Sequence, residues 1–416
     1  YCADANFGMF KERDLAIAER FAENKRKHGY PEGLSVQNTK NSTDSSYNIQ
    51  RVLSDAGLNK GVTLAVQSLD SKVLKAIKRA NIKGEVYNEL QKRFTRDGVH
   101  TYSDIILGLP EETLETFIDG VSQLVTRGQH NRIQFNNLSI LPNAEMGDSE
   151  YQRRYGFDLV TSKMINVHGS LGEWADEIYE TETLVVATNT MPREDWVKAR
   201  QFSWMSSLLY FDKLLQIPLL LSMRDAGISF KDAMSHMMDE SKVKTPILRE
   251  INGLFSQKAR DIQNGDAEYV LSKDWLNIFW PADEFKFIDL AATGKLDAFY
   301  EEAAQAIDDL LVGKGFRGCT NDIIREAVRF NRSLVKLPFQ TEDVELHTKH
   351  NIWEAYQARL KGEEMPILKG DFRYKVDKSK ESWNSWTEWC QKVVWYGNKK
   401  GAYLYPCEPI EQIVNS

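Results

Sequence analysis

Residues 101–112 read Thr-Tyr-Ser-Asp-Ile-Ile-Leu-Gly-Leu-Pro-Glu-Glu. A β-branched and aliphatic run followed by a Gly-x-Pro turn and an acidic helix start is typical of a parallel strand that leads into a crossover helix. Asp104 stands inside this strand. Because strands buried on both faces are usually continuous hydrophobic runs, its carboxylate must be paired or must face a site. From the strand alone, a structural hydrogen bond and a ligand contact are about equally well supported.

Composition limits the class of protein. The chain has 416 residues, of which 42% are hydrophobic and 27% charged, and its net charge is −7. These values indicate a globular protein of two or three domains with no nucleic-acid footprint. Apolar runs such as residues 217–223 are far shorter than the ~18 residues of a membrane span, so no membrane partner is expected. The four cysteines form no CxxC pair and no disulfide framework, which favours a reducing cytoplasm.

Residues 1–142 alternate between strand and helix patterns. The predicted strands are 1–5, 34–38, 61–67, 101–107 and 132–140, and the predicted helices are 13–28, 45–56, 70–78, 86–97 and 112–127. Strands separated by crossover helices indicate a parallel α/β sheet, either open and doubly wound or closed into a complete or partial (β/α) barrel. Both architectures place their sites at the carboxyl ends of the strands.

The second half of the chain has a different character. All ten tryptophans lie at or beyond Trp174, and helical periodicity dominates from residue 196. A helix over 196–215 is expected to bury one apolar face, made of Phe202, Met205, Leu208, Leu209 and Leu215, and to expose Lys198, Arg200 and Asp212. We therefore predict a partial (β/α) barrel over 1–145, its last associated segment and connection over 146–195, a helical region over 196–334 and a mixed α/β tail over 335–416.

Polar residues gather where the predicted strands end. They are Asp4 and Asn6, then Gln37, Asn38 and Lys40, then Gln67, Ser68 and Asp70, then Asp104 with the turn at Gly108, and finally the Leu141-Pro-Asn-Ala144 segment. Helix capping explains some of them individually, and ordinary loop polarity remains an alternative for the set. Five strand ends with such groups at one rim favour a ligand site.

Other polar residues are expected to be structural. Glu111 and Glu112 are most simply charges in solvent at a helix start. His347 and His350 lie three residues apart without a nearby third ligand, so an exposed helix face is favoured over a metal site. No metal ligand is predicted in this chain.

Several short motifs occur together in order. They are Ala3-Asp-Ala-Asn-Phe-Gly8, Val66-Gln-Ser-Leu-Asp70, Ile77-Lys-Arg-Ala-Asn81, Asp104-Ile-Ile-Leu-Gly-Leu-Pro110 and Leu138-Ser-Ile-Leu-Pro142. About the first half of the chain thereby resembles the radical S-adenosylmethionine (SAM) superfamily, and within it the cobalamin-binding-domain group. The resemblance implies a partial (β/α) barrel of the radical SAM type.

The resemblance also implies roles for individual residues. Gln67 and Arg79 match a glutamine and an arginine that bind the ribose and the methionine carboxylate of SAM, and Asp104 matches an acid that binds a ribose hydroxyl. A guanidinium offers a planar fork to a carboxylate, and carboxylates pair with sugar hydroxyls. Backbone near Gly108 and Leu141 would flank the adenine. Asp4, Asn38 and Ser68 complete the candidate cofactor-binding set.

Two departures from the family pattern stand out. The usual Pro-Gly-Glu is Pro110-Glu-Glu112 here, and the Cys-x3-Cys-x2-Cys loop that holds a [4Fe–4S] cluster is absent. Three thiolates must converge on such a cluster, which widely spaced cysteines cannot do. We expect that the cluster loop, the first strand and any cobalamin domain precede Tyr1, so that this chain alone is inactive.

The implied activity is reductive cleavage of SAM to methionine and a 5′-deoxyadenosyl radical, with cobalamin-dependent methyl transfer as an open extension. The implied partners are a small-molecule or biosynthetic-intermediate substrate and an electron donor for the cluster. Two alternatives remain at this point. One is a (β/α) protein that binds an adenosine-containing ligand without a cluster, and the other is an ordinary barrel lyase or isomerase.

Overall fold

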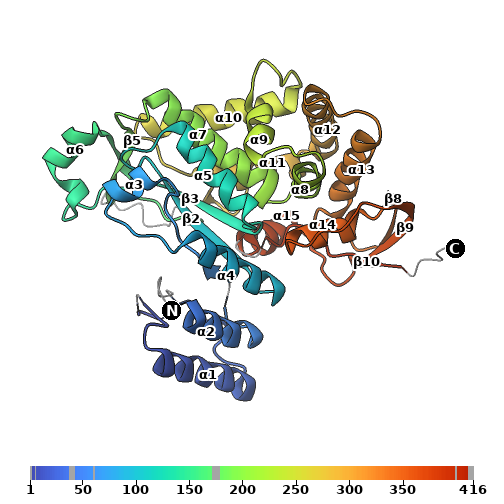
Figure 1. Ribbon diagram of the computed structural model, residues 1–416, viewed down its shortest axis with the longest axis horizontal. Coiled ribbons are helices and arrows are strands. Elements are labelled where there is room, and N and C mark those ends of the chain that lie inside the picture. Colours follow the sequence, from blue (N-terminus) through green and yellow to red (C-terminus); the bar gives the residue numbers. More distant parts are fainter. Residues whose placement is uncertain are drawn as a thin grey trace.

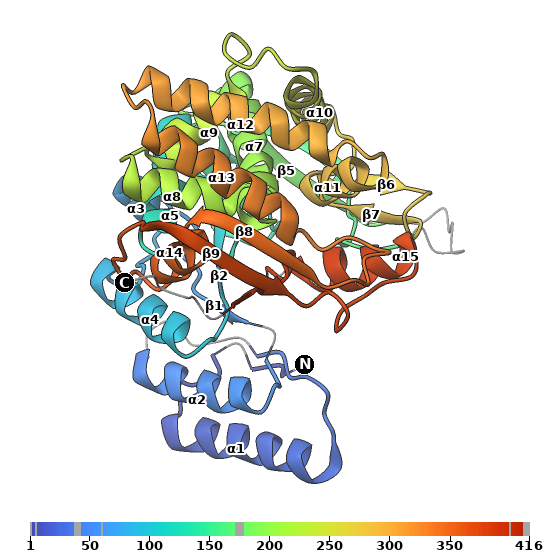
Figure 2. The same ribbon diagram turned by 90° about the vertical axis from the view of Figure 1, so that its right-hand side faces the viewer.

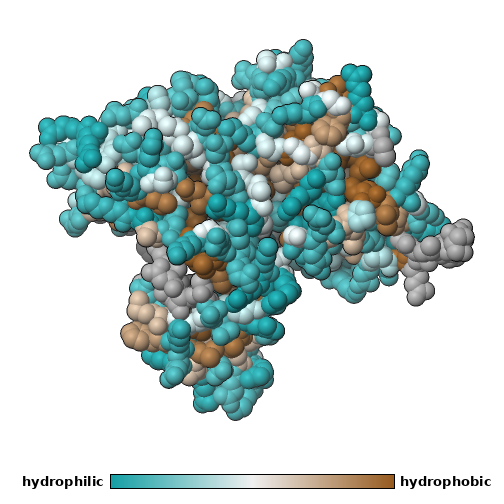
Figure 3. All heavy atoms as spheres, in the orientation of Figure 1, coloured by the Kyte–Doolittle hydropathy of each residue, from teal (hydrophilic) through white to brown (hydrophobic). Residues whose placement is uncertain are grey.

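The computed structural model describes residues 2–4, 6–36, 43–59, 61–170, 179–398 and 401–410. Helices α1 (Lys11–His28) and α2 (Thr43–Asp55) pack on each other and form a small lobe below the rest of the molecule (Figure 1). This lobe has its own apolar core, to which Phe7, Leu34 and Leu53 contribute. On the face shown in Figure 3, hydrophobic side chains form several separate patches.

A parallel sheet lies in the main body of the molecule. Its strands are β1 (Val62–Thr63), β2 (Thr101–Leu107) and β3 (Arg132–Asn137), in the order β1-β2-β3. Helices α3 (Ser71–Ala76) and α4 (Gly84–Arg96) connect β1 to β2, and α5 (Leu114–Thr126) connects β2 to β3. Both strand pairs are parallel. The α/β class and the parallel pairing predicted for this part are confirmed, whereas closure into a barrel remains a prediction.

The strands predicted at 1–5 and 34–38 are not strands in their described parts, residues 2–4 and 34–36. The Cys2 amide donates a hydrogen bond to the Ser35 carbonyl at 2.9 Å, and the Leu34 amide donates one to Leu58. These segments are held in the lobe because Phe7 and Leu34 pack into its small core instead of a sheet.

The predicted strand 61–67 is shortened by a bulge. The Leu64 amide bonds to the Tyr102 carbonyl and the Gln67 amide to the Asp104 carbonyl. The chain thus advances three residues from Leu64 to Gln67 while β2 advances two, which is one extra residue. Gln67 has a φ of 60°, in the left-handed region. The regular ladder therefore stops at Thr63, although the chain stays beside β2.

The predicted strand 132–140 changes partner at its end. β3 ends at Asn137, and the following residues pair antiparallel with β5 (Thr181–Ala187), since the Ile140 amide bonds to Thr183 and the Val185 amide to Leu138. β4 (Asp158–Lys163) in turn pairs antiparallel with β5. Between β3 and β4 lie η1 (Glu145–Gly147) and α6 (Ser149–Tyr155).

A helical region follows β5. Its elements are α7 (Arg193–Ser206), η2 (Ser207–Phe211), α8 (Gln216–Asp225), α9 (Phe230–Met238), α10 (Pro246–Gln263), the short strands β6 (Val270–Ser272) and β7 (Ile278–Trp280), α11 (Ala282–Ala292), α12 (Leu296–Gly313) and α13 (Cys319–Leu334).

The helix predicted over 196–215 is α7 continued by the single π-helical turn η2. All five residues predicted to be buried are fully enclosed, and Lys198 is exposed as predicted. The expected exposure of Arg200 and Asp212 is wrong. Arg200 donates to the Phe135 carbonyl and pairs with Glu268 at 2.8 Å, and Asp212 pairs with Arg132. These internal partners offset the cost of burying the charges of Arg200 and Asp212, so charged side chains can be buried here as well as apolar ones.

The last part of the chain is mixed, as predicted. It contains β8 (Val344–His350), α14 (Ile352–Leu360), β9 (Lys369–Val376), α15 (Trp386–Trp389), η3 (Cys390–Trp395) and β10 (Glu408–Pro409). The strands form an antiparallel sheet, and Figure 2 shows β8 and β9 beside α13. His347 and His350 lie on β8, not on a helix, and His350 pairs with Glu326 at 2.7 Å.

One large apolar core joins the parallel sheet to the helical and C-terminal regions, because it runs from Val66 to Cys407. None of the helices in the described ranges combines the length and the apolar character that crossing a bilayer requires.

Candidate functional site

The two faces of β2 differ in their surroundings. Thr101, Ser103, Ile105 and Leu107 are buried, and Ser103 shares a hydrogen bond of 2.8 Å with Tyr87 of α4. Tyr102, Asp104 and Ile106 point to the opposite face and are half-buried. On that face Asp104 lies in register with Gln134 and Ile106 with Asn136. The face away from the helices is therefore polar, unlike that of a strand buried on both sides.

Arg79 reaches the same part of the sheet from the loop after α3. Its Nη2 donates to the Ala65 carbonyl and its Nε to Asn81 Oδ1, both at 3.1 Å. Asn81 in turn donates to the Ser68 carbonyl, which ties this loop to the end of β1. Burial lowers the pKa of Arg79, and the Asp104 carboxylate opposes this shift in pKa. Arg79 and Asp104, two residues predicted to share a site, thus lie close enough to interact electrostatically.

Gln67 is held at the same strand end by its backbone. Its amide bonds to the Asp104 carbonyl and its carbonyl accepts from the Ile106 amide, so it brackets the middle of β2. A left-handed φ is uncommon outside glycine, and such residues concentrate at functional sites. The structure therefore brings Gln67, Arg79 and Asp104 together.

Ser68 is differently placed from its neighbour. It is buried, and its Oγ donates to Glu112 Oε1 at 2.8 Å. Ser68 therefore faces the protein interior and not the polar face of the sheet. Glu112, expected to be in solvent, is also buried, because the turn after β2 folds its side chain inward. Burial raises the pKa of Glu112 to about 8, with a smaller contribution from Asp70. The unusual Pro110-Glu-Glu112 sequence is the feature from which a special role of Glu112 could have been predicted.

Gly108 and Leu141 lie at the predicted strand ends. Gly108 has a φ of 93°, and a Cβ there would lie 3.1 Å from the Val185 carbonyl oxygen, so β5 passes too closely for a side chain. Leu141 is 68% exposed just beyond β3. Nearby, Lys78 pairs with Glu145 at 2.6 Å across the same edge. A role for Gly108 and Leu141 in binding adenine remains a prediction.

Two predicted site residues are not assembled with the others. Asp4 pairs with Arg13 at 3.1 Å and accepts from the Asn6 amide, at the start of the lobe of α1 and α2. Asn38 lies outside the described residues.

The described cysteines do not converge on one point, as a thiolate-bound cluster requires. Cys2, Cys390 and Cys407 are free, and the last two are buried. Burial raises the pKa of Cys390 to about 12, which disfavours the thiolate that a cluster requires. Within the described ranges, no three His, Cys, Asp or Glu side chains are arranged to hold a metal ion. These residues do not fit a [4Fe–4S] cluster.

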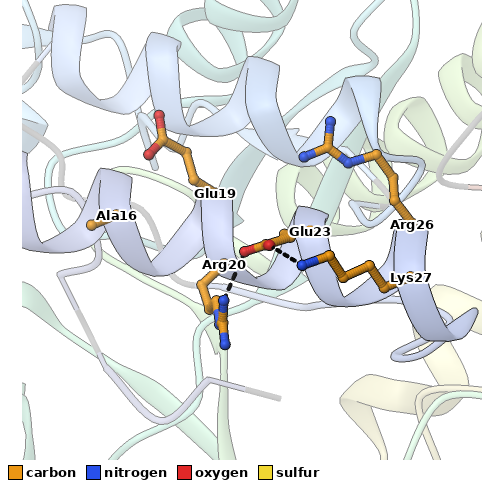
Figure 4. Close-up of a pocket in the computed structure, with 6 residues that line it drawn as sticks. All are labelled: Ala16, Glu19, Arg20, Glu23, Arg26 and Lys27. Atoms are coloured by element: carbon orange, nitrogen blue, oxygen red, sulfur yellow. Dashed lines mark hydrogen bonds and ion pairs between the residues drawn. The ribbon is translucent and has the colours of Figure 1, made fainter.

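A hollow of about 710 Å³ on the surface of α1 is a less convincing site (Figure 4). Its charged side chains pair with one another, since Glu23 bonds to Arg20 at 2.8 Å and to Lys27 at 2.5 Å. Such pairs on an exposed helix face are ordinary and contribute little stability.

Comparison with known proteins identifies relatives. No family model matches the chain. Over 203 residues it is 39% identical to the cobalamin-dependent radical SAM methyltransferase TokK of Streptomyces tokunonensis, which covers 49% of this chain and 29% of that protein. The chain is a homologue of cobalamin-dependent radical SAM methyltransferases. This homology confirms the resemblance to the cobalamin-type radical SAM group.

A second relative of this radical SAM homologue is the 2-(S-pantetheinyl)-carbapenam-3-carboxylate methyltransferase of Streptantibioticus cattleyicolor. It is 38% identical over 198 residues, which are 47% of this chain and 28% of that enzyme. The matched part is thus less than a third of each relative. Among solved structures, TsrM of Kitasatospora setae with cobalamin and a [4Fe–4S] cluster matches 63% of this chain and 52% of its own, at 15% identity and a TM-score of 0.36, which is too weak to support an argument.

Proposed function

We propose that this chain supplies the SAM-binding core of a cobalamin-dependent radical SAM methyltransferase that acts on a small biosynthetic intermediate. The observation that carries the proposal is the position of Arg79, which bonds to the Ala65 carbonyl beside β2 and is near enough for the charge of Asp104 to act on it. The sequence identity to TokK supports the same assignment.

The chemistry of the two charged side chains suits SAM. Arg79 is held by the Ala65 carbonyl and by Asn81, so its guanidinium is oriented before a ligand arrives. It would bind the methionine carboxylate of SAM, and Asp104 would accept hydrogen bonds from ribose hydroxyls. Gln67 would add an amide contact at the end of β1. SAM, when bound, supplies the methyl group that is transferred.

The arrangement of charges also explains why Asp104 remains in a strand. Its carboxylate offsets part of the cost of desolvating Arg79.

Only the relatives indicate an iron–sulfur cluster and cobalamin. TokK is named as cobalamin-dependent and as a radical SAM enzyme. The described cysteines do not fit a [4Fe–4S] cluster, so we assign no reaction step to residues of this chain beyond binding and orienting SAM. An electron donor and a cytoplasmic location belong to the same proposal.

Hydrogen–deuterium exchange tests the location of the site. Addition of SAM to the chain should slow exchange in peptides that cover 62–68, 77–81 and 101–108, because these segments surround Arg79 and Asp104. Peptides of α12 should not change and serve as the internal control. Protection confined to other segments, or none at saturating SAM, would contradict the proposal.

A further inference from the structure

A second cavity lies at the opposite end of the parallel strands. It has a volume of about 410 Å³ and is lined by the segments that precede β2 and β3, residues 98–101 and 128–131, together with parts of α4, α14 and residues 401–406. Its size is within the range of small-molecule sites. α4 and α14 lie side by side in Figures 1 and 2. Among the candidate SAM residues, Asp104 lies in the middle of β2, and Gln67 and Arg79 follow β1, so these residues and this cavity are distinct.

The polar end of this cavity contains the side-chain ammonium of Lys213, which forms no salt bridge with any described residue. Lys213 Nζ donates to Gln216 Oε1 at 2.7 Å and to the His130 carbonyl at 3.4 Å, both neutral groups. Among the described residues, no carboxylate lies within salt-bridge distance of Nζ, and the carboxylate of the adjacent Asp212 pairs with Arg132 at 2.5 Å. Desolvation lowers the pKa of Lys213 to about 8, and the charge of the adjacent Asp212 opposes part of this shift in pKa. An ammonium in such surroundings is costly unless an anion accompanies it.

The charges of the residues that line the cavity also favour an anionic ligand. No aspartate or glutamate is among the residues that line the cavity, and its second charged residue, Lys361 at the mouth, is also a cation. The chain as a whole carries a net charge of −7. A positive cavity on a negative protein selects anionic ligands.

His130 adds an unused polar atom beside Lys213. Its Nδ1 shares a hydrogen bond of 2.7 Å with the Tyr210 hydroxyl, whereas its Nε2 is buried and has no partner among the described residues. Burial, together with the charges of Lys213 and Arg224, lowers the pKa of His130 to about 3, so the ring is neutral. Because the neutral His130 ring carries no positive charge, it does not repel the Lys213 ammonium.

The cavity also has apolar lining. Trp353, Leu360, Leu404 and Pro406 line it together with the ring of Tyr356. The Tyr356 hydroxyl donates to Gln216 Oε1 at 2.6 Å, so the glutamine that holds Lys213 also holds the aromatic wall. Flat aromatic surfaces of this kind pack well against planar ligand groups.

Backbone conformation shows that the polar end is constrained. Lys213 has a φ of 63°, in the left-handed region, which is uncommon for a non-glycine residue and is typical of functional sites. At Gly401 a Cβ would lie 2.7 Å from Asn131 Oδ1 and 2.8 Å from Lys213 Cε. Glycine at this position therefore leaves room for Lys213 to stand where it does.

We propose that this cavity is a second small-molecule site, which binds a carboxylate with a flat apolar body. The carboxylate pairs with the Lys213 ammonium, and the body packs between Trp353 and Leu360. The ligand class is a monoanionic aromatic acid, since one enclosed ammonium balances one negative charge.

The test uses the chain as it stands and 2-naphthoate as the probe, with isothermal titration calorimetry as the readout. Wild type should bind 2-naphthoate saturably and should bind the neutral 2-naphthamide at least about ten-fold more weakly. Lys213→Met should weaken binding of 2-naphthoate at least about ten-fold and leave that of 2-naphthamide unchanged. Charge-assisted hydrogen bonds are of this strength.

Two further variants make the result specific. Lys258→Met is the matched control, because Lys258 is also a half-buried lysine that bonds to a backbone carbonyl, that of Ala267, away from the cavity. It should bind 2-naphthoate like wild type. Leu360→Trp should fill the apolar wall and abolish binding even if Lys213→Met fails to fold. Absence of saturable binding, equal affinity for the acid and the amide, or equal affinity of wild type and Leu360→Trp would overturn the proposal.

Discussion

Ser68 Oγ donates a hydrogen bond of 2.8 Å to Glu112 Oε1, and this bond ties the turn after β1 to the turn after β2. Both residues are buried. Thr190 Oγ1 also donates to the Glu112 carbonyl at 2.8 Å, which joins the segment after β5 to the same point. Glu112 therefore holds together three strand ends beneath the candidate SAM site.

The burial of Glu112 predicts a pH-dependent stability. Its pKa is raised from 4.5 to about 8 in the folded chain, so the folded state keeps a proton that the unfolded state releases. Stability should fall as the pH rises from about 4.5 to about 8. Glu112→Gln should remove this dependence and should be more stable than wild type at about pH 8, by an amount on the order of a few kcal/mol. Urea denaturation across this pH range measures the effect.

The neighbouring Glu111 supplies the control for that experiment, because it is exposed in the same turn. Glu111→Gln should keep the pH dependence of wild type. If Glu112→Gln and wild type have parallel stability profiles, Glu112 does not carry a raised pKa.

The buried charges around Arg132 predict a large loss of stability. Arg132 lies 2.5 Å from Asp212 and 3.2 Å from Asp283, and burial raises the pKa of both carboxyls. Arg132→Met would leave them without a counter-charge and should cost about 3–5 kcal/mol of unfolding free energy. Because protonated carboxyls tolerate burial, the loss should be smaller at about pH 5 than at about pH 8.

Arg260→Met is the comparison, since Arg260 pairs with Glu194 on the surface. Exposed pairs contribute little, so this variant should unfold close to wild type. If urea denaturation gives both variants the same loss of unfolding free energy, the buried charges around Arg132 contribute no more to stability than the surface pair.

The strands were predictable to different degrees for a physical reason. The sequence predicts β2 with the bounds that it has, because its aliphatic run and its Gly-x-Pro turn are local signals. The sequence does not reveal that residues 138–140 leave the parallel ladder for β5, because pairing with a strand some forty positions away is not a local property. The bulge before Gln67 is hidden for the same reason.

The candidate site shows a similar division. Asp104 stands out by its type inside a strand, Arg79 is predicted only through the family resemblance, and in the structure the charge of Asp104 acts on Arg79. The inward turn of Ser68 and Glu112 is not predictable, because a serine beside a strand end and a glutamate at a helix start are normally in solvent. The pairing of Asp212 with Arg132 also depends on the tertiary fold, since 80 residues separate the two.

The absence of a Cys-x3-Cys-x2-Cys loop predicts the behaviour of residues 1–416 toward iron. An iron–sulfur cluster needs converging thiolates, which the described cysteines do not provide. After anaerobic treatment with iron and sulfide, the purified chain should show no charge-transfer absorption in the visible range. It should also form no 5′-deoxyadenosine from SAM and dithionite. A monodisperse brown preparation with a cluster spectrum would contradict this prediction.

Equilibrium dialysis with radiolabelled SAM tests the central claim most directly, because it measures binding at the Arg79–Asp104 pair without requiring turnover. Wild type should bind SAM saturably, and Arg79→Gln and Asp104→Asn should each weaken binding about ten-fold or more, as expected for hydrogen bonds to charged groups. Arg93→Gln, on α4 and paired with Glu89, should bind like wild type. Binding of equal strength in all four proteins, or no binding by wild type, would contradict the assignment of this site to SAM.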